Sequence, residues 1–243
     1  GEPRLRSASS NSDIEFTIPT KSGDDVPITV VGPNDAVEGL GIFTDLVNSG
    51  THHLEAIETK TIEWTSKLKS SRVVKKADAW RSFSYQLKFK LIYSISCMSA
   101  PPGDVDKIMN KLFYECLSYM GVNRNIRRDA RCLPSAWGGL GMFDLNLENL
   151  GARCLLIQNH WGTTSVDGQA LQVGYETFRV DTGLGGNIFD RDYNEVGHLA
   201  KHSWWKHTWH LCYIYKVKIT FEARFEPLAS RENDSTLMDV LVS

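Results

Sequence analysis

The sequence predicts a mainly α-helical protein: a helical bundle behind a small N-terminal β element, followed by a mixed C-terminal segment. Two observations carry this prediction. Between residues 54 and 157, apolar side chains recur at spacings of three and four, the period of a helix with one buried face. Before residue 44, the only periodic runs are short and alternate apolar with polar residues, as strands do.

The chain of 243 residues divides by pattern into four segments. Residues 1–13 are small and polar, and we expect a disordered tail there. Residues 14–44 form the predicted β element, and residues 45–161 form a helical domain. Residues 162–243 are expected to be a helical and irregular C-terminal segment.

The β element begins with a predicted hairpin. Apolar and polar residues alternate in "IEFTIP" (14–19), and "VPITVV" (26–31) is a second strand-like run. The segment "TKSGDD" between them has the composition of a turn. "VEGLGIF" (37–43) is predicted to be a third short strand.

Three helices of the bundle are predicted from residues that share one face. These residues are Leu54, Ile57, Thr61, Trp64 and Leu68 in the first helix, Trp80, Phe83, Leu87, Leu91, Ile95 and Met98 in the second, and Val105, Ile108, Leu112, Cys116 and Met120 in the third. Residues 89–98 are apolar on nearly all sides, so we expect that end of the second helix to be buried in the bundle. Gly121 stands where a C-terminal cap of the third helix would be.

The C-terminal half has weaker patterns. Residues 146–161 are predicted to form a helix with Leu147, Leu150, Cys154 and Ile157 on one side. Beyond it we expect a short helix over 169–178, a helix over 195–215 and a strand over 218–227.

Composition limits the classes of function. The net charge of −2 predicts no strong general attraction to nucleic acid or anionic membrane, so any such affinity must come from a local patch. The five cysteines have no C-x-x-C spacing, which argues against a disulfide framework and a structural zinc site. We expect buried thiols in a reducing intracellular compartment, the nucleus or the cytoplasm. Neither a membrane span nor a signal peptide is expected.

Gly23, Asp24 and Asp25 raise the question of catalysis, because template-copying polymerases present magnesium-binding aspartates on a strand–turn–strand. Such a centre needs carboxylates from two separate elements and a rigid apolar strand that leads into them. Here the preceding residues are polar and flexible, and Pro27 follows at once. We interpret the pair as part of a solvated turn and predict no catalytic residue and no enzyme activity for this chain.

A basic stretch is the first candidate binding site. Residues 67–90 contain eight lysines and arginines against one acid, Asp78, a local charge of +7 with aromatic residues between them. Clustered Lys and Arg are what phosphate binding requires, because each contact releases counterions. The candidate contacts are Lys67, Lys69, Arg72, Lys75, Lys76 and Arg81. The alternative is a solvated helix junction whose aromatic residues belong to the core.

A second candidate cluster is "NRNIRRDAR", where Arg124, Arg128 and Arg131 would share one face of a helix. Arginine suits bidentate contacts with phosphate, although arginine near a helix end is also often solvated or paired.

A metal site is the last candidate. His198, His202, His207 and His210 crowd one segment, and the first two would share a helical face. No acidic residue is placed to complete a ligand set, so neither a metal nor another cofactor is predicted.

The segment "LPSAWGGLGMFDLNLENLGARCLLIQNHW" (133–161) resembles the region downstream of the palm in reverse transcriptases of non-LTR (LINE-like) retrotransposons. The matching residues are Gly138, Gly139, Leu140, Gly141, Met142, Asp144 and Leu145 in the turn, and Asn149, Ala152, Leu155 and Leu156 in the helix. "VEGLGIF" is similar to the strand that ends the palm and begins the thumb, and "ASRENDSTLMD" (229–239) to a segment that follows this region.

This resemblance implies a thumb and post-palm region that grips a template–primer duplex, RNA or an RNA–DNA hybrid, by its backbone. The family's catalytic aspartates lie upstream of the part that this chain resembles, and no residue here matches them. The alternative from another class is a domesticated remnant that acts as a protein-interaction or scaffold subunit. Its candidate interface is Trp204, Trp205 and Trp209, since tryptophan favours such anchors; ordinary core packing would explain them equally.

Overall fold

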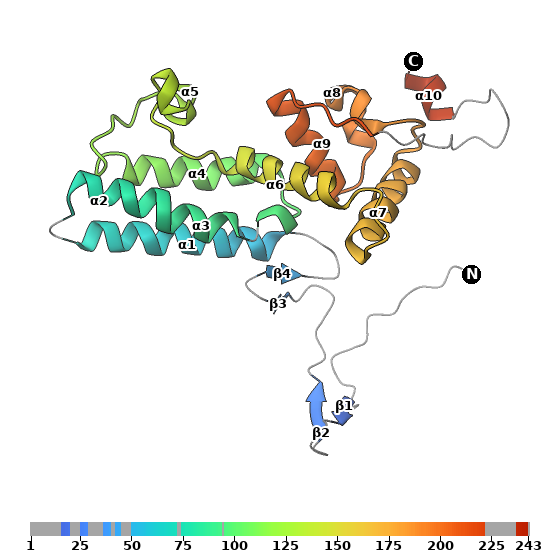
Figure 1. Ribbon diagram of the computed structural model, residues 1–243, viewed down its shortest axis with the longest axis horizontal. Coiled ribbons are helices and arrows are strands. Elements are labelled where there is room, and N and C mark those ends of the chain that lie inside the picture. Colours follow the sequence, from blue (N-terminus) through green and yellow to red (C-terminus); the bar gives the residue numbers. More distant parts are fainter. Residues whose placement is uncertain are drawn as a thin grey trace.

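A computed structural model describes residues 16–19, 25–28, 36–39, 42–44, 50–71, 74–93, 95–221 and 237–242. The protein is mainly helical with small β hairpins near its N-terminus, which confirms the predicted fold class (Figure 1). Among the described helices, each is too short or too polar to cross a bilayer.

The predicted first hairpin is present. Strand β1 (Phe16–Pro19) pairs antiparallel with β2 (Asp25–Ile28), with Phe16 opposite Ile28. The turn between them, which includes Asp24, lies outside the described residues.

The prediction of one strand over 37–43 is wrong. That segment folds back as a second hairpin, in which β3 (Val37–Gly39) pairs with β4 (Ile42–Thr44). An alternating pattern is equally compatible with one strand or two short ones, so it does not reveal the reversal. Phe43 anchors this hairpin through an edge-on contact with the ring of His53, their centroids 6.2 Å apart.

The bundle consists of α1 (Thr51–Ser70), a second helix and α4 (Pro102–Cys116), which lie side by side in Figure 1. The second helix is continuous but changes type: α2 (Lys76–Arg81), a π-helical turn η1 (Ser82–Leu87) and α3 (Lys88–Ile92). A short 3₁₀ turn, η2 (Ile95–Cys97), leads toward α4. The predicted face residues Ile57, Trp64 and Leu68 of α1 are buried, which confirms its orientation.

The π-helical turn explains an unusual spacing in the second helix. Its buried side chains Ala79, Phe83, Leu87 and Leu91 are spaced by four, whereas a regular α-helix has 3.6 residues per turn. A wider π turn offsets the drift and keeps these residues on one face.

The prediction that residues 89–98 are buried on nearly all sides is wrong, because Phe89 and Tyr93 are 62% and 64% exposed.

The third predicted helix ends earlier than expected, at Cys116, and a turn over residues 117–121 carries the predicted cap. Val105, Ile108, Leu112, Cys116 and Met120 are all buried. Gly121 has a φ of +76°, and the amide of Val122 donates to the carbonyl of Leu117 at 2.9 Å. This hydrogen bond across a left-handed glycine is a Schellman-type cap.

Beyond α4 the chain forms α5 (Arg128–Cys132), the 3₁₀ turn η3 (Ser135–Trp137) and α6 (Leu145–His160). Helix α6 matches the predicted helix over 146–161, with Leu150 and Ile157 buried. Leu147 does not belong to the buried side as expected; it lies in the first turn and is 48% exposed.

The C-terminal half is more helical than predicted. It contains α7 (Val166–Thr182), η4 (Ile188–Asp190), α8 (Tyr193–Val196), η5 (Gly197–Leu199), α9 (Trp204–Tyr215) and α10 (Leu237–Val242). The helix expected over 169–178 is therefore longer.

The predicted helix over 195–215 is interrupted. The side chain of Ser203 accepts a hydrogen bond from the amide of Lys206 and caps the N-terminus of α9. The aromatic pattern of this segment does not reveal that a new helix begins there. Residues 218–221 of the predicted strand are not in a strand, and the rest of that prediction lies outside the described residues.

Two hydrophobic cores meet within α6. The first core is made by α1 to α4 and ends at Leu145; the second begins at Leu150 and is made by α6 to α9. The predicted segment boundary at residue 161 is the end of α6. Cys116 and Cys212 are buried, but Cys97 is exposed, contrary to the expectation that all five thiols are buried.

Candidate nucleic-acid interface

Four lysines gather where three helices meet at one end of the bundle, and we call this surface the basic end: Lys67, Lys69, Lys75 and Lys76. Helix α1 ends, α2 begins and α4 ends there, at the left in Figure 1. The indole Nε1 of Trp80 donates to the carbonyl of Met120 at 3.2 Å, which joins α2 to the turn that follows α4. This contact holds the start of α2, with Lys75 and Lys76, beside the chain that leaves α4.

The lysines are exposed because the opposite face of each helix is buried. In α1, Trp64 and Leu68 point into the core, so Lys67 and Lys69 in the last turn face outward. Positive charge in the last turn also interacts favourably with the negative end of the helix dipole.

Most of this charge has no carboxylate partner. Lys67, Lys75 and Lys76 make no ion pair with any described residue. Lys69 alone of the four is paired, its Nζ lying 2.8 Å from Oε2 of Glu115. The stem of Lys76 lies against Gly121, where an added Cβ would come within 2.8 Å of the lysine Cδ.

The other predicted contacts of the basic stretch lie apart or outside the described residues. Arg81 is 77% exposed one turn further along, and its guanidinium lies 3.9 Å from the carboxylate of Asp78. Arg72 lies outside the described residues.

The prediction that Arg124, Arg128 and Arg131 share one helical face is wrong, because Arg124 precedes α5 and each arginine has a different environment. The guanidinium of Arg124 lies over the ring of Tyr114, 4.9 Å from its centroid. That of Arg131 lies over Phe113 at 4.5 Å. Both are cation–π contacts within the fold.

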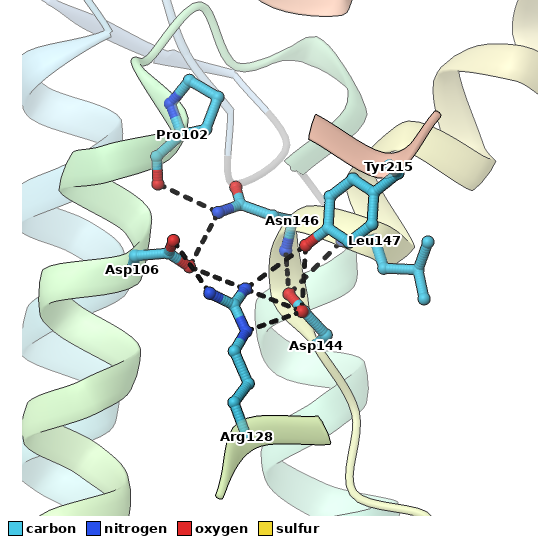
Figure 2. A network of polar contacts seen from close by, with 7 residues as sticks. All are labelled: Pro102, Asp106, Arg128, Asp144, Asn146, Leu147 and Tyr215. Carbon is cyan, nitrogen blue, oxygen red and sulfur yellow. Dashed lines mark hydrogen bonds and ion pairs between the residues drawn. The ribbon is translucent and has the colours of Figure 1, made fainter. Parts of the chain in front are cut away.

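Arg128 is the centre of a polar network that joins α4, α5, α6 and α9 (Figure 2). It donates to both carboxylate oxygens of Asp106, at 2.9 and 3.0 Å, and to Oδ2 of Asp144 at 2.7 and 3.1 Å. Burial opposes its charge, but the two carboxylates outweigh burial and raise the pKa of Arg128 above its usual value. Arg128 is a structural clamp between carboxylates.

Asp144 has two structural roles in this network. Its Oδ1 accepts from the backbone amides of Asn146 and Leu147 and so caps the N-terminus of α6. Its Oδ2 accepts from the Tyr215 hydroxyl at 2.9 Å. Burial and the Asp144 charge raise the pKa of Tyr215. An Asp directly before an apolar helix indicates an N-cap in the sequence. The sequence gives no sign that Asp106 and Tyr215 belong to the same network, because they are distant along the chain.

The structure explains why the turn before α6 contains three glycines. A Cβ on Gly139 would meet the carbonyl oxygen of Leu133 at 2.0 Å, and Gly138 and Gly141 have positive φ. The motif therefore brings the chain back against α5, where Met142 donates to the carbonyl of Arg131 at 2.9 Å.

The tryptophans of α9 belong to the second core. Trp205 and Trp209 are 5% and 2% exposed. Trp204 is half-buried and donates through Nε1 to the carbonyl of Ser96 at 2.6 Å. Core packing therefore accounts for this trio, which does not present a continuous outer surface.

The histidines do not form the arrangement expected from the sequence. His198 lies in η5 and His202 in a bend before α9, so the two do not share a helical face. His202 and His207 have ring nitrogens 3.1 Å apart, and burial is the main cause that lowers the pKa of His207 to about 3. Within the described residues, no group of three or more His, Cys, Asp or Glu is placed to hold a metal ion.

Comparisons of this chain with protein-family models, curated proteins and solved structures found no match.

Proposed function

We propose that this chain binds nucleic acid through backbone contacts made by the basic end, as the thumb-like region of a retroelement reverse transcriptase would. The observation that carries the proposal is that Lys67, Lys75 and Lys76, exposed where α1 ends and α2 begins, have no carboxylate partner among the described residues. Three exposed ammonium groups without a carboxylate partner suit a phosphate backbone, because each phosphate contact releases a condensed counterion.

The contrast with other exposed lysines strengthens this proposal. Lys107, Lys201 and Lys218 are also exposed, but each lies 2.7–2.9 Å from an aspartate carboxylate. Positive charge is locally neutralised there, whereas at the basic end only Lys69 has such a partner. Among these described lysines, those at the basic end therefore keep a positive charge that no carboxylate neutralises.

Arg124 and Arg131 are secondary candidates for phosphate contacts, since their guanidinium groups already lie over aromatic rings. We leave out Arg128, because a phosphate could engage it only by leaving Asp106 and Asp144 without their partner. The proposed role is one of binding without catalysis.

The competing explanation for the basic end is helix stabilisation. Lys67 and Lys69 in the last turn of α1 interact favourably with its helix dipole, each by about 0.3–1 kcal/mol, whereas Lys75 and Lys76 stand at the N-terminus of α2, where positive charge is unfavourable. On that explanation, removing the lysines would lower stability and leave nucleic-acid affinity unchanged.

A pair of triple variants separates the two explanations. The basic-end variant carries Lys67→Ala, Lys75→Ala and Lys76→Ala; the matched control carries Lys107→Ala, Lys201→Ala and Lys218→Ala, so that both lose the same charge. We expect the basic-end variant to bind a labelled RNA–DNA hybrid about tenfold or more weakly than the native chain at low salt. Fluorescence anisotropy measures the affinity, and thermal unfolding checks that both variants are folded.

Equal affinities for the two variants would contradict the proposal, as would a native chain that does not bind the hybrid at low salt. A lower melting temperature for the basic-end variant without any loss of affinity would favour helix stabilisation instead.

A further inference from the structure

Three aromatic side chains form an exposed line along the second helix, and we call them the aromatic stripe: Tyr85, Phe89 and Tyr93. They are 71%, 62% and 64% exposed. Large aromatic residues are usually at least partly buried, so three on one helix at this exposure are unusual.

The π-helical turn aligns the aromatic stripe. Residues spaced by four drift round a regular α-helix by about 40° per step, but a wider turn offsets this drift. The same geometry keeps Phe83, Leu87 and Leu91 on the buried face.

Cationic side chains accompany the stripe along the second helix. Arg81 precedes Tyr85 by the same spacing of four and leads toward the basic end. Lys90 is exposed and makes no ion pair with any described residue. Two cations of this helix are paired, Arg81 with Asp78 at 3.9 Å and Lys88 with Glu148 of α6 at 2.5 Å.

We propose that the aromatic stripe binds a single-stranded segment of nucleic acid, with its bases stacked on Tyr85, Phe89 and Tyr93. This inference rests on the proposed function, since the basic end would hold the adjoining backbone. Within a duplex each base is stacked between its neighbours, so successive base faces are open to aromatic rings only along an unpaired strand. The cationic flanks favour a polyanion over the apolar face of a protein helix.

The stripe is tested with a triple variant, Tyr85→Ala, Phe89→Ala and Tyr93→Ala, in the full chain. The ligands are a fluorescently labelled single-stranded DNA oligonucleotide of mixed sequence and a blunt RNA–DNA hybrid. Stacking on one ring typically strengthens binding by a factor of about five or more, so we expect the triple variant to lose at least about tenfold in affinity for the single strand. Its affinity for the blunt hybrid should change by less than about twofold.

Two control variants make the result specific. Trp137→Ala removes an aromatic side chain that is 75% exposed on the loop between α5 and α6, and it should leave both affinities unchanged. Tyr85→Phe combined with Tyr93→Phe keeps the rings but removes the hydroxyl groups, and it should retain single-strand binding.

The outcomes for the two surfaces are distinguishable. A native chain that binds the blunt hybrid but not the single strand overturns the stripe proposal and leaves the basic end standing. Unchanged single-strand affinity in the triple variant also overturns it, and so does an equal loss for both ligands. If the triple substitution instead dissociates an oligomer of the chain, the stripe is a protein contact and the proposal is wrong.

Discussion

Asp144 accepts hydrogen bonds from the amides of Asn146 and Leu147, from Arg128 and from the hydroxyl of Tyr215 (Figure 2). Its side chain is only 9% exposed, so water replaces few of these partners when they are lost. One carboxylate thus begins α6 and also ties it to α5 and α9. A buried carboxylate with this many hydrogen-bond partners contributes far more to the stability of the fold than an exposed acid does.

We therefore expect Asp144→Ala to lower the free energy of unfolding by about 2–3 kcal/mol, from the lost cap and from the unpaired hydrogen-bond donors. The matched control is Asp129→Ala, because Asp129 also pairs with an arginine, Arg127, but both side chains are about 80% exposed. That control should cost less than about 1 kcal/mol. Urea unfolding measures both, and similar losses would show that the network does not stabilise the fold.

At the scale of elements, the approach of the glycine turn to α5 depends on Gly139 having no side chain. The carbonyl of Leu133 accepts from the amide of Gly141 at 2.9 Å, and a Cβ on Gly139 would lie only 2.0 Å from that oxygen. Gly151 of α6 is the opposite case: it is exposed, lies within a helix and has no atom within 4 Å of an added Cβ.

Alanine at the two positions should have effects of opposite sign. We expect Gly139→Ala to destabilise the protein by about 2 kcal/mol or more, because the backbone must move. Gly151→Ala should stabilise it by about 0.5–1 kcal/mol, since glycine is a poor helix former. Thermal unfolding of the two variants measures the signs, and a destabilising Gly151→Ala or a neutral Gly139→Ala would contradict this description of the turn.

Helical periodicity predicted the elements that have one buried face and failed where another constraint decided. It identified α1, α4 and α6 from residues such as Ile57, Leu112 and Ile157, which are buried. It could not detect the reversal between β3 and β4 or the fresh start of α9 at Ser203. The apolar composition of residues 89–98 suggested burial, but exposure of Phe89 depends on which helices pack nearby, and periodicity does not contain that information.

The candidate site was predictable only as a charged stretch. The sequence shows how many lysines lie between 67 and 90, but not which of them have a carboxylate partner. Lys69 pairs with Glu115, 46 residues away, and Arg128 pairs with Asp106 and Asp144. Such contacts arise from packing of separate helices, so the division between paired and unpaired cations emerges only with the tertiary structure.

At the scale of the whole molecule, two cores are joined into one body by α6 and by Arg153. This arginine is fully buried and donates to the carbonyl of Met98 in the first half and to Trp204 and Thr208 in the second. Burial disfavours the charged guanidinium and lowers the pKa of Arg153 to about 9. Hydrogen bonds to neutral acceptors satisfy its donors. The bundle is thus held firmly against the C-terminal half, which suits a body that presents a fixed basic surface.

The central claim is that the unpaired lysines of the basic end contact phosphates, and the salt dependence of hybrid binding tests it most directly. The logarithm of the affinity should fall linearly with the logarithm of salt concentration, with a contribution to the slope of about 0.7–0.9 from each phosphate contact. We predict that the variant lacking Lys67, Lys75 and Lys76 has a slope shallower by about 2–3 than the native chain, while the ion-paired control keeps the native slope. Identical slopes for all three proteins, or an affinity that does not change with salt, would contradict the account.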